Sequence, residues 1–209
     1  IGTHSGVTAG GGPTHNDIAD LALYRAIPNL TVCVPADAGQ CAKFIRASMD
    51  YEGPMIIRID RAGSPNVYAE DYELEIGKAI ELMEGNDATV ISCGSNLYEC
   101  LMAAKMLKEE NGLSIEILDV HTVKPLDTES IIRVANKTGH VVTVEDHSIN
   151  GGLGGAVAEV LCEAGYKGSF KRIGMPDEFA VLGAVDEIYH YYGMDRHGIV
   201  KTVREMLGK

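Results

Sequence analysis

Basic residues are scarce in this sequence. Its 209 residues include 18 Lys and Arg against 30 Asp and Glu, which gives a formal net charge of −12. No cluster of Lys or Arg occurs, and nucleic-acid affinity comes mostly from neutralising phosphates, so we expect no nucleic-acid partner. The sequence also lacks a long apolar run and a signal-peptide pattern, which predicts no membrane partner.

Cysteine pairs with metal-ligand spacing are missing as well. The five cysteines include no C-x-x-C, and several lie inside apolar runs, which favours buried thiols and no metal site. An odd number of thiols without a signal peptide indicates a reducing, cytoplasmic setting. The five residues are Cys33, Cys41, Cys93, Cys100 and Cys162.

The sequence does contain a regular alternation of elements. Hydrophobic residues make up 45% and charged residues 23% of the chain, which excludes a disordered tail or a coiled-coil rod. Short β-rich runs alternate with helix-length segments, a pattern that predicts βαβ units, mostly parallel sheets and an α/β fold with three α/β/α layers. The expected strands are 30–34, 55–60, 88–93, 114–120, 140–145 and 169–173.

Several residues mark expected helices. Asp37 with Gln40 resembles a capping box, and Asp195 is placed to cap the last helix. One apolar stripe predicts a buried helix face. It consists of Leu153, Ala156, Val157, Val160 and Leu161.

A break in this alternation predicts two parts. Ala62-Gly63-Ser64-Pro65, followed by an acidic, tyrosine-bearing stretch, is typical of a linker, which we place at 62–76. The second part, 77–209, has enough strands and helices to fold by itself. The first part, 1–61, has too few, so we expect it to be the rear of a domain whose front lies upstream.

The densest polar cluster surrounds Gly10 to Gly12, with His4 on one side and His15 on the other. Glycines let a backbone approach a ligand closely, and a helix expected to begin near Pro13 would favour an anion at its N-terminus. Histidine can transfer protons near neutral pH. Composition alone leaves open a glycine-rich surface turn with two solvent-exposed histidines.

Several runs, in order along the chain, resemble the transketolase family. Those that resemble the end of its pyrimidine-binding domain are Thr3-His4, Gly12-Pro13-Thr14-His15, Leu23 to Leu30 and Val34 to Asp37. Those that resemble the C-terminal domain of transketolases and deoxyxylulose-phosphate synthases are Leu118 to Asp127, Tyr192 to Asp195 and Gly198-Ile199. The resemblance implies that 1–61 is the rear of a thiamine-diphosphate pyrimidine-binding domain and 77–209 a transketolase C-terminal domain.

The resemblance implies an enzyme that uses thiamine diphosphate to move a two-carbon ketol unit between sugar phosphates. It places His15 beside the reacting carbons as a catalytic residue, and His4 and Arg61 as substrate-binding residues at the sugar phosphate. An arginine at the carboxyl end of a strand also points into a ligand crevice, and its planar fork suits phosphate. An ion pair of Arg61 with Asp60 or a linker acid is the alternative.

One departure from the family lies in the glycine-rich loop. The resemblance implies an acidic pair where this chain has Gly10 and Gly11, and the spacing from His4 to Pro13 is shorter. Because the second acid contacts a donor hydroxyl in the family, we expect a shift from xylulose 5-phosphate toward another ketose, or weaker discrimination. The alternative is that Asn16 restores the contact.

Other family features are absent. No Gly-Asp-Gly motif occurs, and the family's activating glutamate and stacking aromatics lie upstream of the Thr-His run. The resemblance therefore implies that thiamine diphosphate, with Mg²⁺ or Ca²⁺, is bound mainly by regions or a chain not present here, and no cofactor-binding residue is assigned. We expect a chain that is inactive alone, forms homodimers and partners a diphosphate-binding N-terminal transketolase subunit.

Two further clusters have structural interpretations. Glu145-Asp146-His147 before the glycines of 151–155 superficially suggests dinucleotide binding, but Val157 occupies the third glycine position. We favour tight packing of strand and helix there, with His147 and Asn150 near a subunit contact. His190-Tyr191-Tyr192 is interpreted as packing near an interface rather than as a recognition patch.

Two alternatives to a transketolase stay open. A deoxyxylulose-phosphate synthase or the β subunit of a 2-oxoacid dehydrogenase would share the two-domain architecture, but would act on a 2-oxoacid with loss of carbon dioxide. Gly12-Pro13-Thr14-His15 favours transketolase. A non-catalytic dimerisation module is the other alternative, and it is consistent with the missing glutamate.

Overall fold

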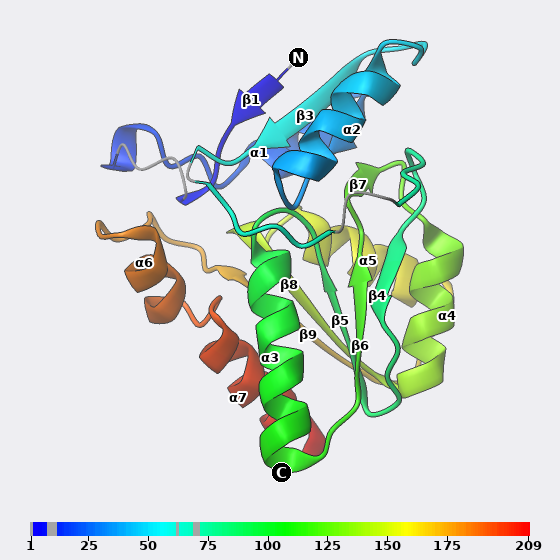
Figure 1. The fold of residues 1–209 in the computed structure, drawn as a ribbon, viewed down its shortest axis with the longest axis vertical. Helices are drawn as coiled ribbons and strands as arrows, with labels where there is room; N and C mark the ends of the chain where they lie inside the picture. Colours follow the sequence, from blue (N-terminus) through cyan, green and yellow to red (C-terminus); the bar gives the residue numbers. More distant parts are fainter. Residues whose placement is uncertain (1, 8–11, 62, 69–71) are drawn as a thin grey trace.

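Two β-sheets and the helices packed on them form the molecule (Figure 1). The computed structural model describes residues 2–7, 12–61, 63–68 and 72–209. The strand order is β1-β3-β2-β7 in the first sheet and β4-β6-β5-β8-β9 in the second. Among the described residues, no helix combines the length and the apolar character needed to cross a membrane.

The first sheet is built mainly by the N-terminal part of the chain. Parallel pairing joins β3 to both β1 and β2, while β7 is antiparallel to β2. Its strands are β1 (Gly2–His4), β2 (Thr31–Cys33), β3 (Met55–Ile59) and β7 (Thr122–Lys124). Its helical segments are η2 (Gly12–Thr14), α1 (Asp20–Ala26) and α2 (Ala38–Ser48).

The second sheet is parallel apart from β4, which pairs antiparallel with β6. Its strands are β4 (Ile80–Met83), β5 (Ala88–Ser92), β6 (Ile115–Asp119), β8 (His140–Ser148) and β9 (Ser169–Met175). The helices are α3 (Asn96–Asn111), α4 (Thr128–Thr138), α5 (Leu153–Glu163), α6 (Val185–Tyr191) and α7 (Arg196–Leu207). Helices α3 and α7 pack together on one face, and α4 and α5 on the other, which gives three layers (Figure 1).

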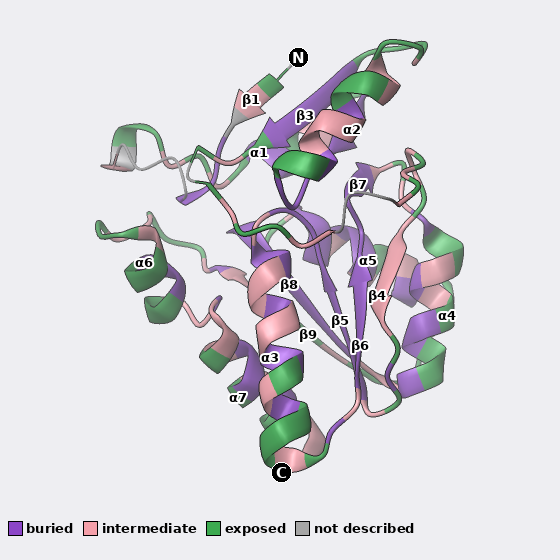
Figure 2. Cartoon of the chain, viewed as in Figure 1, coloured by how far each residue is buried: buried purple, intermediate pink, exposed green. Residues whose placement is uncertain are grey.

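The central strands of the second sheet are buried on both faces (Figure 2). Parallel strands covered by helices on both sides are buried in this way, and their polar residues, such as Thr89, Glu116 and Asp119, are buried as well. One apolar cluster also crosses between the two parts: Val32 and Val34 of the first part pack with Ile91, Leu118 and Val123 of the second. The two sheets therefore share a core.

All six expected strands are present, with ends shifted by a few residues. Strands β4 and β7 were not expected, because both are short and β7 pairs across the boundary between the two parts. A helix near Pro13 was also expected, and this is wrong: the segment forms one 3-10 turn, and the α-helix begins at Asp20. The anion-binding helix start that we inferred there is therefore withdrawn.

The capping predictions are confirmed in part. The Asp37 and Asp195 carboxylates accept hydrogen bonds from the Gln40 and Gly198 amides, at 2.7 and 2.8 Å. The predicted capping box is wrong in one respect. Its second bond would join the Gln40 side chain to the Asp37 amide, but that side chain accepts a hydrogen bond from the Ala36 amide and donates one to Asp119. The apolar stripe of α5 packs in the core as expected.

The thiol predictions hold for three of the cysteines. All five cysteines are free, and burial raises the pKa of the Cys33 and Cys100 thiols to about 12. Cys93 is buried as well. Cys41 is half-buried and Cys162 is exposed, so the prediction of a buried thiol is wrong for these two residues. Cys162 lies near the end of α5, on the side that faces away from the core.

Candidate functional site

The predicted substrate residues follow neighbouring parallel strands. His4 ends β1 and pairs in register with Ile59, the last residue of β3, and Arg61 lies just beyond Ile59. The carboxyl ends of both strands therefore meet at one edge of the first sheet, where open α/β sheets bind ligands. The Arg61 side chain is exposed at this edge and available to a ligand.

His15 lies on the same polar segment, just after η2. It is exposed, and its Nδ1 lies 2.8 Å from the Thr14 hydroxyl. Gly10 and Gly11, on which the substrate expectation depends, lie outside the described residues. Roles for His4, His15 and Arg61 therefore stay predictions.

The segment after His4 is held in a buried position. Gly6 donates its amide to the Asp17 carbonyl at 2.8 Å, and Val7 donates its amide to Oδ1 of Asp146 at 3.0 Å. Gly6 has a φ of +80°, and a Cβ there would lie 2.2 Å from Oδ2 of Asp146. Only glycine fits this position without moving the carboxylate.

A buried arginine lies directly beneath. The Arg58 side chain on β3 donates to Oδ2 of Asp20 at 2.8 Å and to the Asp146 carbonyl at 2.7 Å. Burial by itself would lower the pKa of Arg58, but the Asp20 and Asp146 carboxylates raise it, so the guanidinium stays charged. Arg58 and Asp20 are 3% and 1% exposed, which makes this a desolvated ion pair.

The run Glu145-Asp146-His147 lies next to this pair, at the end of β8. The Glu145 carboxylate accepts the Leu153 and Gly154 amides at 2.6 and 2.8 Å, at the start of α5. Burial raises the pKa of Glu145 to about 7, although these two bonds oppose the shift. A Cβ on Gly154 would approach Oε1 of Glu145 at 2.9 Å, so the glycine serves the tight packing that we predicted.

His147 joins the two parts of the chain. Its Nε2 accepts the Ala22 amide at 3.3 Å and its Nδ1 donates to the Ser148 carbonyl at 2.7 Å, an assignment that fits a neutral ring. Burial lowers the pKa of His147, which agrees with that state. His147 is buried and contacts α1 of its own chain, and Asn150 is exposed, so the subunit contact expected near these two residues stays a prediction.

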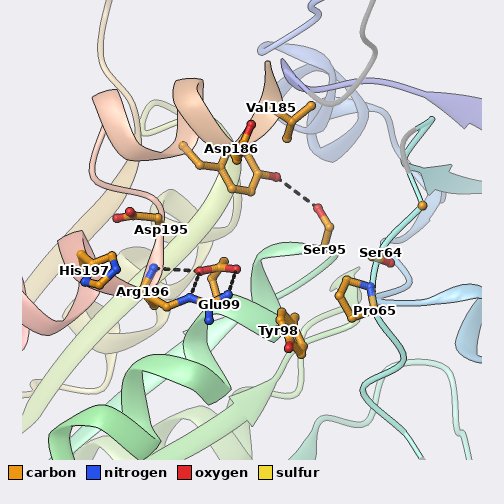
Figure 3. Close-up of a pocket in the computed structure, with 12 residues that line it drawn as sticks. Ser64, Pro65, Ser95, Tyr98, Glu99, Val185, Asp186, Asp195, Arg196 and His197 are labelled. Atoms are coloured by element: carbon orange, nitrogen blue, oxygen red, sulfur yellow. Dashed lines mark hydrogen bonds and ion pairs between the residues drawn. The ribbon is translucent and has the colours of Figure 1, made fainter. Parts of the chain in front are cut away.

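A cavity of about 580 Å³ lies beside the segment that follows Arg61 (Figure 3). Gly63 to Pro65 line one side, and the starts of α3, α6 and α7 line the other. Within it, Arg196 makes a two-pronged ion pair with Glu99 at 2.7 and 2.9 Å. Ser95 lies 3.1 Å from the Tyr189 hydroxyl.

Sequence reasoning missed this cavity because its lining comes from segments far apart in the chain. The nearest sequence signal was His190-Tyr191-Tyr192. His190 lies 2.8 Å from the Asp195 carboxylate, and Tyr191 is 67% exposed. The interface that we predicted for these residues stays a prediction.

Comparison with known proteins shows which family this chain resembles in sequence and fold. The family described as transketolase, pyrimidine binding domain, matches residues 1–65, and transketolase, C-terminal domain, matches 77–199. A Phocaeicola vulgatus protein, named as a subunit of an apulose-4-phosphate transketolase, is 39% identical over all of this chain and 67% of its own length. A Bacteroides fragilis 1-deoxy-D-xylulose-5-phosphate synthase is 36% identical over 95% of this chain and 31% of its own length.

A solved structure described as a split-gene transketolase, an inactive β4 tetramer, has a TM-score of 0.87 and 37% identity. The match covers 100% of this chain and 66% of that one. The fold and these comparisons thus define an α/β protein of the thiamine-enzyme type, built on two mostly parallel sheets. The chain belongs to the transketolase family, as its sequence motifs predicted, and it spans about two thirds of the length of the relative from P. vulgatus.

Proposed function

We propose that this chain is the C-terminal subunit, or a fragment of it, of a thiamine-diphosphate-dependent transketolase of the split type, which moves a two-carbon ketol unit between sugar phosphates. The observation that carries the proposal is the match of both family domains in order, together with a relative named as one subunit of a transketolase. The strand-edge position of Arg61 and His4 supports a substrate site at the first sheet.

We assign the cofactor mainly to regions or a chain not present here. Family membership implies thiamine diphosphate, but this sequence has no Gly-Asp-Gly motif. Within the described residues, no group of three or more His, Cys, Asp or Glu side chains is arranged to hold a metal ion. The residues present therefore do not fit a diphosphate and metal cradle, and we assign no step through the cofactor to them.

Roles for the residues of this chain follow from their positions. We assign Arg61 and His4 to the sugar phosphate and His15 to proton transfer near the reacting carbons. An exposed guanidinium can grip phosphate through two parallel hydrogen bonds. Homodimerisation and a cytoplasmic location belong to the same proposal, and free, partly buried thiols favour a reducing setting.

Reconstitution tests the proposal. The chain should be mixed with the diphosphate-binding chain of the same source, thiamine diphosphate and Mg²⁺, and ketol transfer between sugar phosphates measured. We expect turnover for the mixture and none for either chain alone. Carbon dioxide release from pyruvate would favour the synthase instead, and a stable complex without turnover would favour a dimerisation module.

The phosphate role of Arg61 has its own test in that mixture. Arg61→Ala should raise KM for phosphorylated sugars by about 10- to 100-fold, because a charge-assisted interaction of roughly 1.5–3 kcal/mol is lost. Arg133→Ala is the matched control, since Arg133 pairs with Glu81 at the surface of the second sheet. An unchanged activity ratio between phosphorylated and unphosphorylated sugars would refute the assignment.

The substrate is proposed to be a ketose other than xylulose 5-phosphate. Glycines replace the acids that the family uses at positions 10 and 11, and one relative is named for apulose 4-phosphate. Comparing kcat/KM across a panel of ketose phosphates, for the native mixture and for Gly11→Asp, tests this. A strong preference for xylulose 5-phosphate that the substitution leaves unchanged would contradict it.

A further inference from the structure

The polar loop is attached to the second part of the chain at a narrow neck. We define the neck as Ser5–Val7 on one side and Asp17–Asp20 on the other. The two sides are joined to each other by the Gly6 amide and the Asp17 carbonyl, at 2.8 Å. His4 and His15 therefore lie within a few residues of the neck.

Asp146 fixes the first side of the neck. Its Oδ1 accepts the Val7 amide at 3.0 Å, across a sequence separation of 139 residues. Ser5 and Val7 are 2% and 1% exposed, so this hydrogen bond is shielded from water. A bond from an amide to a buried carboxylate is stronger than one between neutral groups.

Arg58 fixes the second side through the same cluster. It binds Asp20 with its Nε and the Asp146 carbonyl with one Nη. The backbone adds a further link, because the Ser148 amide donates to the Ile18 carbonyl at 2.8 Å. Both sides of the neck are thus held on the end of β8, a strand of the second sheet.

Ionised groups are a costly way to join two packed surfaces. Desolvating a buried ion pair costs several kcal/mol, and apolar residues of similar size often give equal or greater stability. What the ion pair and hydrogen bonds of this cluster add is one defined arrangement, since a shifted neck would break them and leave charges unpaired. The cluster therefore serves position more than stability.

We propose that Asp146, supported by Arg58, is a positioning residue that holds the neck so that His4 and His15 meet the sugar phosphate in one geometry. This inference rests on the proposed function for its kinetic consequence. The second part of the chain would then set substrate affinity without touching the substrate. It does so through the contacts at the end of β8, where the Asp146 carboxylate holds the first side of the neck.

The variants to compare are Asp146→Ala, Asp146→Asn and Glu116→Ala. Asparagine keeps an oxygen that can accept the Val7 amide but lacks the charge. Glu116 is the matched control, because it is also a buried carboxylate but lies on β6, away from the neck. Its carboxylate accepts a hydrogen bond from the Gly85 amide at 2.8 Å. Removing it tests the general effect of losing a buried carboxylate.

Amide hydrogen exchange on the chain is the first measurement. We expect Asp146→Ala to speed exchange of amides in 3–7 and 12–20 by tenfold or more relative to Glu116→Ala, with Asp146→Asn between that variant and the native chain. Exchange in this segment no faster than in the Glu116 variant would overturn the proposal. This measurement does not depend on any enzymatic activity.

Kinetics of the reconstituted enzyme is the second measurement. We expect Asp146→Ala to raise KM for the sugar phosphate about tenfold with a smaller change in kcat, partial recovery in Asp146→Asn, and native values in Glu116→Ala. A loosened neck with unchanged KM would overturn the positioning role. If the native mixture has no ketol transfer, the proposed function fails, and exchange alone then decides whether Asp146 holds the neck.

Discussion

At the scale of single residues, the buried carboxylates have different pKa shifts because their partners differ. Asp119, at the end of β6, accepts hydrogen bonds from the Gln40 amide and the Tyr68 hydroxyl. No cation lies against it among the residues described, and burial raises the pKa of Asp119 to about 7 in spite of these two bonds. Asp127 has a lowered pKa although it is partly buried, because the Ala79 and Ser130 amides bind its carboxylate.

The raised pKa of Asp119 predicts a pH-dependent effect of Asp119→Asn. The folded chain keeps this proton between the ordinary value near 4 and about 7, whereas the unfolded chain loses it, so stability falls as pH rises through that window. The Asp119→Asn variant has no carboxyl proton at this position, so its stability does not fall in this window. Denaturation at pH 5 and pH 8 should show a melting temperature that is raised at both pH values, roughly 2–4 °C per kcal/mol, and raised more at pH 8, because at pH 5 the native chain has lost only part of this stability.

Asp127→Asn is the matched control for this experiment. The pKa of Asp127 is lowered, so its ionised form stabilises the fold at pH 8 and that contribution is lost as pH falls below 4. The same substitution there should therefore lower stability at pH 8. A difference between Asp119→Asn and the native chain that stays constant with pH would show that Asp119 is ionised throughout.

At the scale of elements, α5 illustrates how glycines set the distance between a helix and a sheet. Gly154 faces Thr143 and Glu145 of β8, and an added Cβ would lie 2.7 Å from the Thr143 hydroxyl. Gly155, its neighbour, has Nη1 of Arg25 at 3.6 Å as the nearest contact. Adjacent glycines in one helix thus meet opposite conditions.

This difference predicts opposite effects of alanine. Gly154→Ala should lower the free energy of unfolding by roughly 1–3 kcal/mol, because the helix or the Glu145 side chain must move. Gly155→Ala should raise it by about 0.5–1 kcal/mol, because alanine favours the helix and the space is open. Urea denaturation of both variants measures these changes in the free energy of unfolding. Equal effects would mean that α5 does not pack as closely on the sheet as described.

At the scale of the whole molecule, the two parts of the chain form one body. Strand β7 comes from the second part by sequence and completes the first sheet beside β2. Lys124, the last residue of β7, donates hydrogen bonds to the Arg25 and Ile27 carbonyls at the C-terminal end of α1. The neck cluster and the shared core add contacts at separate places, so we expect both parts to unfold together.

The cofactor prediction also belongs to this scale. The isolated chain should bind thiamine diphosphate with Mg²⁺ weakly or not at all, because the diphosphate motif is not in its sequence. Calorimetric titration of the chain alone, and then of the mixture with its diphosphate-binding partner, measures this. Micromolar binding by the isolated chain would contradict the division of labour that we propose.

Local and periodic features were readable from the sequence. Six of the strands, the apolar face of α5, the caps at Asp37 and Asp195 and the family depend on neighbours within a few residues or on linear motifs, so the sequence alone predicts them. The prediction of a helix near Pro13 was wrong, because Gly12–Thr14 form a single 3-10 turn and α1 begins only at Asp20.

Features that join distant segments were decided by the tertiary structure. Asp146 and Val7 are 139 residues apart, and nothing in either neighbourhood indicates that they bond. The pairing of β7 with β2, the cavity beside Gly63 and the opposite roles of Gly154 and Gly155 likewise depend on packing between elements. Most of the elements and the family of this protein follow from its sequence alone, whereas the buried charges that meet follow from the tertiary structure, because burial and pairing exist only once the sheets are packed.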